Sequence, residues 1–397
     1  MPNSTNDAFN NCFVSLKLNG SDSKMSPMSF SIIEFDSIYQ FYPKAKLVVS
    51  DYEGILNEYL GFVDGTQVEI TLGENQDNAK KCTFIVDKNA VPQQATSSNG
   101  TGGDFEITLI HEYYGKQVKT SKAYNSDIAD AVKKLAKKYK FEKTDIESTS
   151  NNGIWYQPYI TDYEFICNMI PFAYSSSARK TPFFAFIDSN NIFHFKSFYK
   201  MFESNPLETL TYATNPINIV GDKKALSSIN FSQIGLHKIK PLYACNSFSY
   251  DKEGNIQEST DKLSDYLTTQ GKYPTVNKSK DITEIVSLYD YDIKLDDTKN
   301  NNKGYLSYLH KDCLLPDKII INTILNKKLV CGNTVKIELP SVKSNSSSEK
   351  SLRNSGKYII ESSYHIWNGT KPRTMLVCSK QKVNLSGDYK FNSLLYS

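Results

Sequence analysis

Two stretches of the chain decide its fold class: GFVDGTQVEITLG at 61–73 and KLVCGNTVKIELP at 328–340. In each, a turn-forming glycine, Gly65 or Gly332, stands three positions before a valine. The residues that follow alternate between apolar and polar side chains, which is the pattern of a half-buried strand. The two stretches therefore predict β structure near both ends of the chain, and their likeness favours a duplicated domain.

Further alternating segments surround the first stretch. Asp64-Gly65 is a hairpin turn signal, and SSNGTGG at 97–103 reads as a flexible hairpin loop. We expect strands in CFVSLKL at 12–18, AKLVVS at 45–50, TQVEITL at 66–72, CTFIVD at 82–87 and FEITLI at 105–110. The exception is YEGILNEYLG at 52–61, whose apolar residues have helical spacing. So many short strands in about 100 residues predict a small antiparallel barrel or sandwich.

The character of the sequence changes at 117–213, where we expect an α+β domain. Ser126-Asp127 opens a helix whose apolar stripe is Ile128, Val132, Leu135 and Tyr139, and whose outer face carries Lys133, Lys134, Lys137 and Lys138. Thr161 and Glu164 form a capping box for a second helix that Pro171 ends. A hairpin follows, with FFAFI at 183–187 and IFHFKSF at 192–198 flanking a turn.

The remainder, from about 214 to 388, returns to β patterning. The expected strands are SINFSQI at 228–234, YACNSFSYD at 243–251, KIIINTIL at 318–325, NTVKIEL at 333–339, GKYIIESSYHIW at 356–367 and TMLVCSK at 374–380. Residues 252–304 are polar and rich in lysine and aspartate, so we interpret them as an insertion between strands. Ser341–Gly356 reads as a long hairpin loop, and Asn368-Gly369 is the strongest hairpin signal in the chain.

Composition excludes several classes of protein. The 397 residues predict two or three domains, and 39% hydrophobic with 22% charged residues is a soluble globular balance. No apolar run approaches the roughly 18–20 residues that span a bilayer, and we expect no secretory signal. The net charge is only +3, and Arg179, Arg353 and Arg373 are the only arginines. Sequence-specific nucleic-acid binding is therefore not expected, because it usually relies on arginine.

The search for reactive groups leads us to expect no catalytic residue, no metal site and no cofactor. The seven cysteines are widely spaced without a CxxC pair, which favours buried, reduced thiols: Cys12, Cys82, Cys167, Cys245, Cys313, Cys331 and Cys378. The five histidines lack metal-binding spacing, and we interpret His194 and His365 as packing residues on strands. The sequence has no phosphate-binding glycine loop and no nucleophile elbow.

Two acidic groups have residue types found in functional sites, but structural roles account for both. Asp290, Asp292, Asp296 and Asp297 have oxygen ligands suited to a hard cation, but they lack calcium-loop spacing and read as a solvated edge. Asp162 and Glu164 resemble an acid and base pair, but the helix cap accounts for both. The four lysines of 133–138 read as a solvated helix face.

Three collinear segments resemble the central baseplate hub protein of contractile-tailed, T-even-type phages, a group related to late control gene D proteins and to the hub part of VgrG. The segments are DSIY at 36–39 with KLVV at 46–49 and DGTQVEI at 64–70; WYQP at 155–158 with TDYEFI at 161–166; and GNTVKI at 332–337 with GKYIIES at 356–362 and the Asn368-Gly369 turn. His365 stands at the family's His position. Pro171, the insertion and the serine-rich loop depart from the family pattern.

The resemblance implies two tail-tube-like antiparallel β-barrel domains around an α+β module. It assigns 1–116 to the first barrel, 117–213 to the α+β domain, 214–251 and 305–388 to the second barrel, 252–304 to the insertion and 389–397 to a tail. It implies a structural, non-enzymatic homotrimer that joins the sixfold tail tube to a threefold spike. The implied partners are the tail tube, spike, tape measure and other baseplate proteins, with double-stranded DNA passing through the lumen.

The resemblance also implies a place in the virion baseplate after synthesis in the host cytoplasm, with the spike as a separate protein. We expect the channel lining to be acidic or neutral and the lysines of 133–138 to lie outside it. Three alternatives stay open. They are a β-rich carbohydrate- or receptor-binding module with an exposed aromatic platform, a hydrolase with scattered site residues, and the hub of a related machine such as a type VI secretion system, a pyocin-like particle or a long-tailed siphophage.

Overall fold

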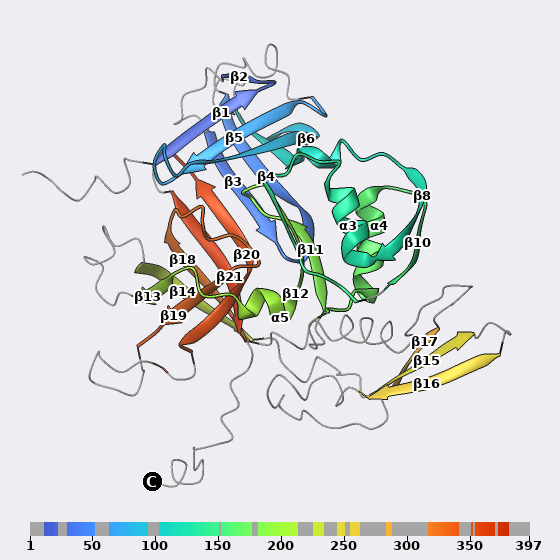
Figure 1. Ribbon diagram of the computed structural model, residues 1–397. Helices are drawn as coiled ribbons and strands as arrows, with labels where there is room; N and C mark the ends of the chain where they lie inside the picture. Colours follow the sequence, from blue (N-terminus) through green and yellow to red (C-terminus); the bar gives the residue numbers. More distant parts are fainter. Residues whose placement is uncertain are drawn as a thin grey trace, which may run out of the picture.

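The protein is mainly β, and the short helices among its described residues lie in the middle of the chain (Figure 1). The fold class expected from the sequence is therefore confirmed. The computed structural model describes residues 12–22, 30–51, 63–93, 103–150, 152–176, 182–212, 225–233, 244–250, 255–262, 283–287, 317–340, 351, 354–369 and 372–380. The helix expected at 52–61 and most of the loop expected at 97–103 lie outside these residues.

The first half of the chain forms an antiparallel array in the order β3-β4-β7-β6-β5-β1-β2. Its strands are β1 (Phe13–Leu18), β2 (Ser21–Asp22), β3 (Phe30–Ser37), β4 (Gln40–Asp51), β5 (Gln67–Gly73), β6 (Lys80–Gln93) and β7 (Gly103–His111). All five strands expected here are present. Alternation works as predicted, because Val68, Ile70 and Leu72 of β5 are fully buried while the residues between them are partly exposed.

The second half contains β13 (Thr209–Tyr212), β14 (Ala225–Gln233), β18 (Asp317–Ile324), β19 (Thr334–Glu338), β20 (Gly356–Trp367) and β21 (Arg373–Lys380). Their order is β19-β13-β14-β18-β21-β20, and β19 also pairs with β20, so hydrogen-bonded neighbours run in a ring. Strand β13 departs locally from the antiparallel pattern expected, because it pairs in parallel with β14 and β19. Parallel neighbours cannot be joined by a tight hairpin, so the alternating pattern gave no sign of this pairing.

The two halves share one 13-stranded sheet because β3 pairs with β20. Moving away from β3, the strands of the first half follow in the order β4, β7, β6, β5, β1. Moving away from β20, those of the second half follow in the order β21, β18, β14, β13, β19. By position β5 therefore corresponds to β13, and β19 to β1. The similar sequences 61–73 and 328–340 contain β5 and β19, which do not occupy equivalent positions in the two halves. Their likeness reflects the same local turn, since Gly65 and Gly332 have φ values of 82° and 79°.

The α+β module lies beside the first half (Figure 1). It has an antiparallel ribbon, β8 (Thr120–Asp127) with β10 (Asn152–Ile160), and a sheet of β11 (Phe183–Ile187), β12 (Ile192–Ser197) and β9 (Lys143–Ile146). Helix α3 (Ile128–Ala136) contacts both the ribbon and strands β9 and β12. Helix α4 (Asp162–Met169) packs on α3 and β10. Short 3-10 turns, η2 (Glu112–Tyr114) and η3 (Ile170–Phe172), and helix α5 (Phe198–Glu203) complete it.

Both helices expected in the α+β module begin where the sequence predicts. Asp127 caps α3, and its carboxylate accepts a hydrogen bond from the Asp130 backbone N–H at 2.7 Å. Thr161 and Glu164 form the predicted capping box of α4. Pro171 lies in η3, directly after α4, so the helix ends as expected. The four lysines of 133–138 are exposed on α3 and the residues after it.

One strand lies in a different sheet from the one expected. The segment 243–251 does form a strand, β15 (Ala244–Tyr250), but β15 pairs with β16 (Ile256–Lys262) and β17 (Thr283–Ser287) in a sheet of its own. Both partners come from residues 252–304, the segment we interpret as a polar insertion between strands. Strand β16 contains the polar run QESTDK, which lacks alternation between apolar and polar residues. Hydrophobic periodicity therefore does not predict this strand. The remaining domain boundaries stay predictions.

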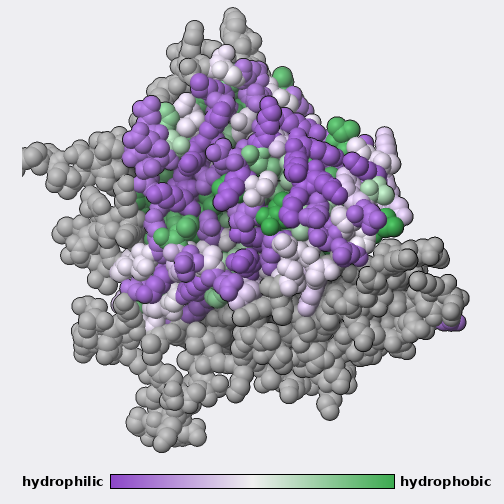
Figure 2. All heavy atoms as spheres, viewed as in Figure 1, coloured by the Kyte–Doolittle hydropathy of each residue, from purple (hydrophilic) through white to green (hydrophobic). Residues whose placement is uncertain are grey.

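Four clusters of buried side chains make up the core. One fills the first half, one the α+β module and one the second half. The fourth is a small cluster where the three parts meet, and it contains Ile38, Phe184, Phe186, Phe198, Met201, Cys331 and Ile359. The face seen in Figure 2 is mostly hydrophilic, with separate small apolar areas.

Gly332 provides a test of this meeting point. A Cβ at position 332 would lie 2.5 Å from Phe186 Cζ, whereas a Cβ at Gly65 would meet no atom within 4 Å. We expect Gly332→Ala to lower the free energy of unfolding by about 2–5 kcal/mol, from left-handed strain plus overpacking. The matched variant Gly65→Ala should lose only about 1–2 kcal/mol. Denaturant unfolding followed by circular dichroism measures both, and equal losses would contradict the packing described here.

Candidate functional site

The strongest concentration of buried polar groups lies where the two β halves meet the hairpin turn of the α+β module. Strand β3 contributes Glu34 and Asp36, which face the same side because they are two positions apart. The β11–β12 turn contributes Asp188, and the connection between β18 and β19 contributes Lys327. None of these four side chains exceeds 2% exposure. We call this set, together with His194 of β12, the polar junction.

Lys327 and Glu34 form an ion pair that links residues 293 positions apart in sequence. The Lys327 ammonium also lies 3.5 Å from the Ser189 carbonyl oxygen. Burial raises the pKa of Glu34 above its ordinary value, although the Lys327 charge acts in the opposite direction. Among the described Lys–carboxylate pairs, this is the one in which both side chains are almost fully buried.

Asp36 connects all three parts of the protein through its carboxyl group. It accepts hydrogen bonds from the backbone N–H of Ser189 at 2.8 Å and of Cys331 at 3.3 Å. It also contacts the Ser363 hydroxyl of β20. Burial raises the pKa of Asp36, and the hydrogen bond to Ser363 opposes that shift. The contacts fix the hairpin turn and the β18–β19 connection against β3.

Asp188 and His194 hold the hairpin turn in shape. The Asp188 carboxylate accepts from the backbone N–H groups of Asn190 and Ile192, and it lies 3.0 Å from His194 Nε2. On the other side, His194 Nδ1 lies 3.7 Å from Asp145 of β9. Burial alone would lower the pKa of His194, but the hydrogen bonds to Asp145 and Asp188 outweigh burial and raise it.

His365 extends the polar contacts into β21. Its ring nitrogens lie 3.1 Å from the Thr374 hydroxyl and 3.3 Å from the Ser363 hydroxyl. Burial and the nearby Lys327 charge lower the pKa of His365 well below its ordinary value, so the ring is neutral. The packing role expected for His365 and His194 thus includes specific hydrogen bonds to neighbouring strands.

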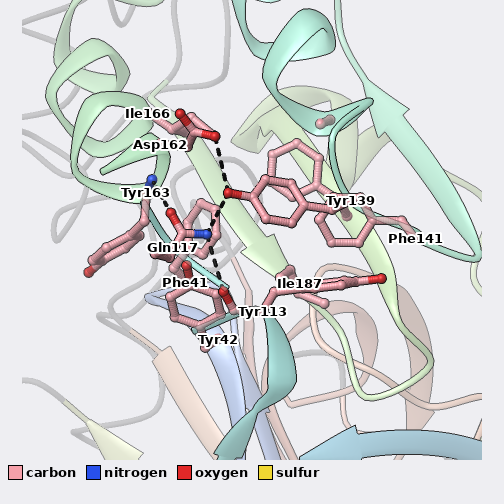
Figure 3. A pocket seen from close by; sticks show the side chains of 12 residues that line it. Phe41, Tyr42, Tyr113, Gln117, Tyr139, Phe141, Asp162, Tyr163, Ile166 and Ile187 are labelled. Atoms are coloured by element: carbon pink, nitrogen blue, oxygen red, sulfur yellow. Dashed lines mark hydrogen bonds between the residues drawn. The ribbon is translucent and has the colours of Figure 1, made fainter. Parts of the chain in front are cut away.

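A second polar group lies inside the α+β module, in a small cavity with aromatic walls (Figure 3). The Gln117 amide donates to Tyr139 Oη at 2.8 Å and to the Tyr113 carbonyl oxygen at 3.2 Å, and it accepts from the Tyr163 N–H at 3.1 Å. Tyr139 in turn donates to Asp162 at 3.1 Å. The cavity has about 10 Å³ of space, which is the lower limit for one water molecule. It is too small for a substrate.

The expected role of Asp162 is corrected by this network. The helix cap accounts for Glu164, whose carboxylate accepts from the Thr161 N–H at 2.8 Å. Asp162 instead turns inward, where Lys138 donates to both of its oxygens at 2.8 and 3.0 Å and Gln157 donates at 2.9 Å. Asp162 therefore ties the end of α3 to α4 and β10.

Some of the other candidate residues from the sequence have described side chains, and the rest do not. Lys133 pairs with Asp130 at 2.9 Å on the surface of α3. His111 caps η2, and burial lowers its pKa to about 3. Of the described cysteines, Cys82, Cys331 and Cys378 are buried, and Cys12 and Cys167 are half-buried. The structure does not describe the side chains of six further candidates: the acidic group at 290–297, the loop at 100–102, His237, His310, Cys245 and Cys313.

The described residues contain no group of three or more His, Cys, Asp or Glu side chains placed to hold a metal ion. In the same part of the chain, no helix is long and apolar enough to cross a bilayer. The polar junction is enclosed, so its groups cannot reach a substrate in this conformation. What its geometry can do is hold three structural units in one arrangement.

Breaking the buried ion pair tests this conclusion. Lys327→Met should lower the free energy of unfolding by about 3–5 kcal/mol, because it leaves the Glu34 carboxylate buried without its partner. The double variant Lys327→Met with Glu34→Met should recover most of that loss, since apolar replacements of buried pairs are often neutral. Lys133→Met, at an exposed pair, is the control and should cost less than about 1 kcal/mol. Equal losses in the free energy of unfolding for Lys327→Met and Lys133→Met would contradict a structural role for the buried ion pair.

Comparison by sequence finds no relative: no protein-family model matches, and no curated protein matches. Comparison by structure does. A tail protein from Neisseria meningitidis MC58 is similar with a TM-score of 0.56 and 9% identity, over 93% of this chain and 97% of that one. The 43 kDa tail protein of prophage MuSo2 from Shewanella oneidensis gives 0.54 and 7%, over 93% and 98%.

A third similar structure is the Francisella PdpA–VgrG complex, with a TM-score of 0.50 and 10% identity. The match covers 97% of this chain but only 55% of that one. At these identities the likeness concerns the fold alone. The chain has the fold of these tail proteins along nearly its whole length.

Proposed function

We propose that this protein is a structural component of a phage-type tail, and that it forms the central hub of the baseplate. The observation that carries the proposal is the 13-stranded sheet, in which a seven-stranded and a six-stranded unit are joined through β3 and β20, and six strands of the first correspond in neighbour order to the six of the second. A chain with two related β units can present six such units when three copies form a ring. Such a ring would match a sixfold tube on one side and a threefold spike on the other.

The partners follow from that position. They are two further copies of this chain, the tail tube protein, the spike, the tape measure protein and neighbouring baseplate proteins. Double-stranded DNA would pass through the lumen without sequence-specific contacts. The protein would act by assembly and without catalysis, as part of the virion tail after synthesis in the host cytoplasm. The similarity to two tail proteins, one of them from a prophage, over more than nine-tenths of each chain supports this proposal.

Two other readings have specific support. The likeness to a VgrG-containing complex favours a hub of a related contractile machine, such as a type VI secretion system. A carbohydrate- or receptor-binding module is favoured by Tyr156 and Tyr159 on β10, which are 64% and 68% exposed. Aromatic rings in that position resemble a binding platform.

The solution mass separates these readings. Three copies of the 45.0 kDa chain would give a particle of about 135 kDa, and closed rotational symmetry predicts a ring with a central hole. Light scattering measures the mass, and negative-stain images of the same peak reveal the ring. A 45.0 kDa monomer at high concentration, both alone and with its spike protein, would overturn the hub assignment. Binding of glycans by that monomer, lost in Tyr156→Ala, would favour the alternative.

The ring makes a second prediction about charge. Exposed lysines at 133, 134, 137 and 138 would attract DNA if they lined the channel. We expect them on the outside, because a basic lining would retain DNA during passage. A reconstruction of the ring by electron cryomicroscopy locates α3 directly, and lysines facing the lumen would contradict the prediction.

A further inference from the structure

The charges of the polar junction do not balance in their ordinary states. Three carboxyl groups, Glu34, Asp36 and Asp188, face one ammonium, Lys327, and one imidazole, His194. With all carboxyls ionised and the imidazole neutral, the junction would carry a net charge of −2. Buried charge without a partner is strongly unfavourable, so the folded protein has to neutralise this excess. Two added protons would do so.

The geometry assigns the first proton to His194. Its Nε2 lies 3.0 Å from Asp188 and its Nδ1 lies 3.7 Å from Asp145, so a carboxylate faces each ring nitrogen. A neutral imidazole has only one N–H and would leave one of these contacts without a donor. Lys196 of β12 also pairs with Asp145, and the His194 ring stacks on Phe186 of β11 at 4.8 Å. A charged ring satisfies both carboxylates.

The second proton belongs on Asp36. Among the described residues no cation contacts Asp36, whereas Glu34 contacts Lys327. Asp188 accepts from two backbone N–H groups and lies beside His194. When Asp36 is protonated, either Asp36 or Ser363 can be the donor of the hydrogen bond between them. Ser363 can donate onward to the neutral His365 ring at 3.3 Å. A protonated Asp36 thus has an acceptor for its hydrogen.

We propose that the polar junction is a proton-dependent lock, which holds the hairpin turn of the α+β module against the two β halves while His194 and Asp36 are protonated. The titratable and charged groups that face it from the surrounding elements are Cys82 on β6, Asp145 on β9, Lys196 on β12, Glu34 on β3, Lys327 and Cys331 between β18 and β19, and His365 on β20.

The direction of the pH dependence follows from the two groups. The pKa of His194 and that of Asp36 are both raised in the folded protein, so folding takes up protons at both. The stabilisation is complete at pH below the unfolded pKa of each group and is lost as pH rises through the folded pKa. The opening equilibrium of the junction should therefore increase with pH, by up to about tenfold per pH unit for each proton released.

Two buried thiols provide a local readout of opening. Cys331 is fully buried at the junction, where its backbone N–H donates to Asp36. Cys378 is equally buried in the core of the second half and serves as the internal control. Labelling with N-ethylmaleimide at pH 5 to 9, a range that begins below the ordinary pKa of histidine, followed by peptide mass spectrometry, gives the rate at each thiol. Because ionisation of an exposed thiol accelerates both rates alike, their ratio isolates opening at the junction.

We expect the ratio of Cys331 to Cys378 labelling to rise as pH increases from 5 to 9, by up to about tenfold per pH unit for each proton released. A constant ratio would overturn the proposal. In Asp36→Asn and in His194→Asn one titrating group is removed, so the ratio should rise less steeply in each, whatever the absolute stability of the variant. Slopes unchanged from the parent protein in both variants would also overturn it. If a variant fails to fold, the parent slope still decides.

Discussion

The pairing of β3 with β20 is the constraint on which the rest of the structure depends. Six residue pairs, from Ser37 with Ser362 to Ile32 with Trp367, join two β units that are far apart in sequence. The register also sets which side chains face inward. It places Glu34 and Asp36 opposite His365 and Ser363, in a region that the hairpin turn of the α+β module then covers. Each of the three parts loses a partner if this register slips by one residue.

The polar character of the meeting point explains how so specific an arrangement is reached. Apolar surfaces alone pack in several ways, because hydrophobic burial has no direction. The small apolar cluster around Phe186 therefore contributes area, while the carboxyls of Asp36 and Asp188 demand particular donors at particular places. Burying these groups costs free energy of hydration, and the return is a single geometry between three units. That rigidity suits a protein proposed to transmit symmetry between a tube and a spike.

Local features of the fold could be predicted from sequence, because the interactions that create them lie within a few residues. The capping box of Thr161 and Glu164 and the turn between β11 and β12 are examples. In strand β3, Phe30, Ile32, Glu34 and Asp36 share one buried face. Because two of these four residues are acidic, the sequence gives only a weak indication that this face is buried. The partner of Glu34 could not be predicted, because Lys327 is brought to it only by the β3–β20 pairing. The inward turn of Asp162 was likewise missed, since it depends on Gln157 and Tyr139 from other elements.

The central claim is that the two β halves form one unit held at β3 and β20, and hydrogen exchange measured by mass spectrometry tests it most directly. If the claim is right, peptides from β3 and β20 are among the slowest to exchange, and they become exchangeable together as denaturant is added. The outer strands β1 and β13 should exchange earlier. If β3 instead opens with the first half while β20 remains protected, the halves are independent units and the account is wrong.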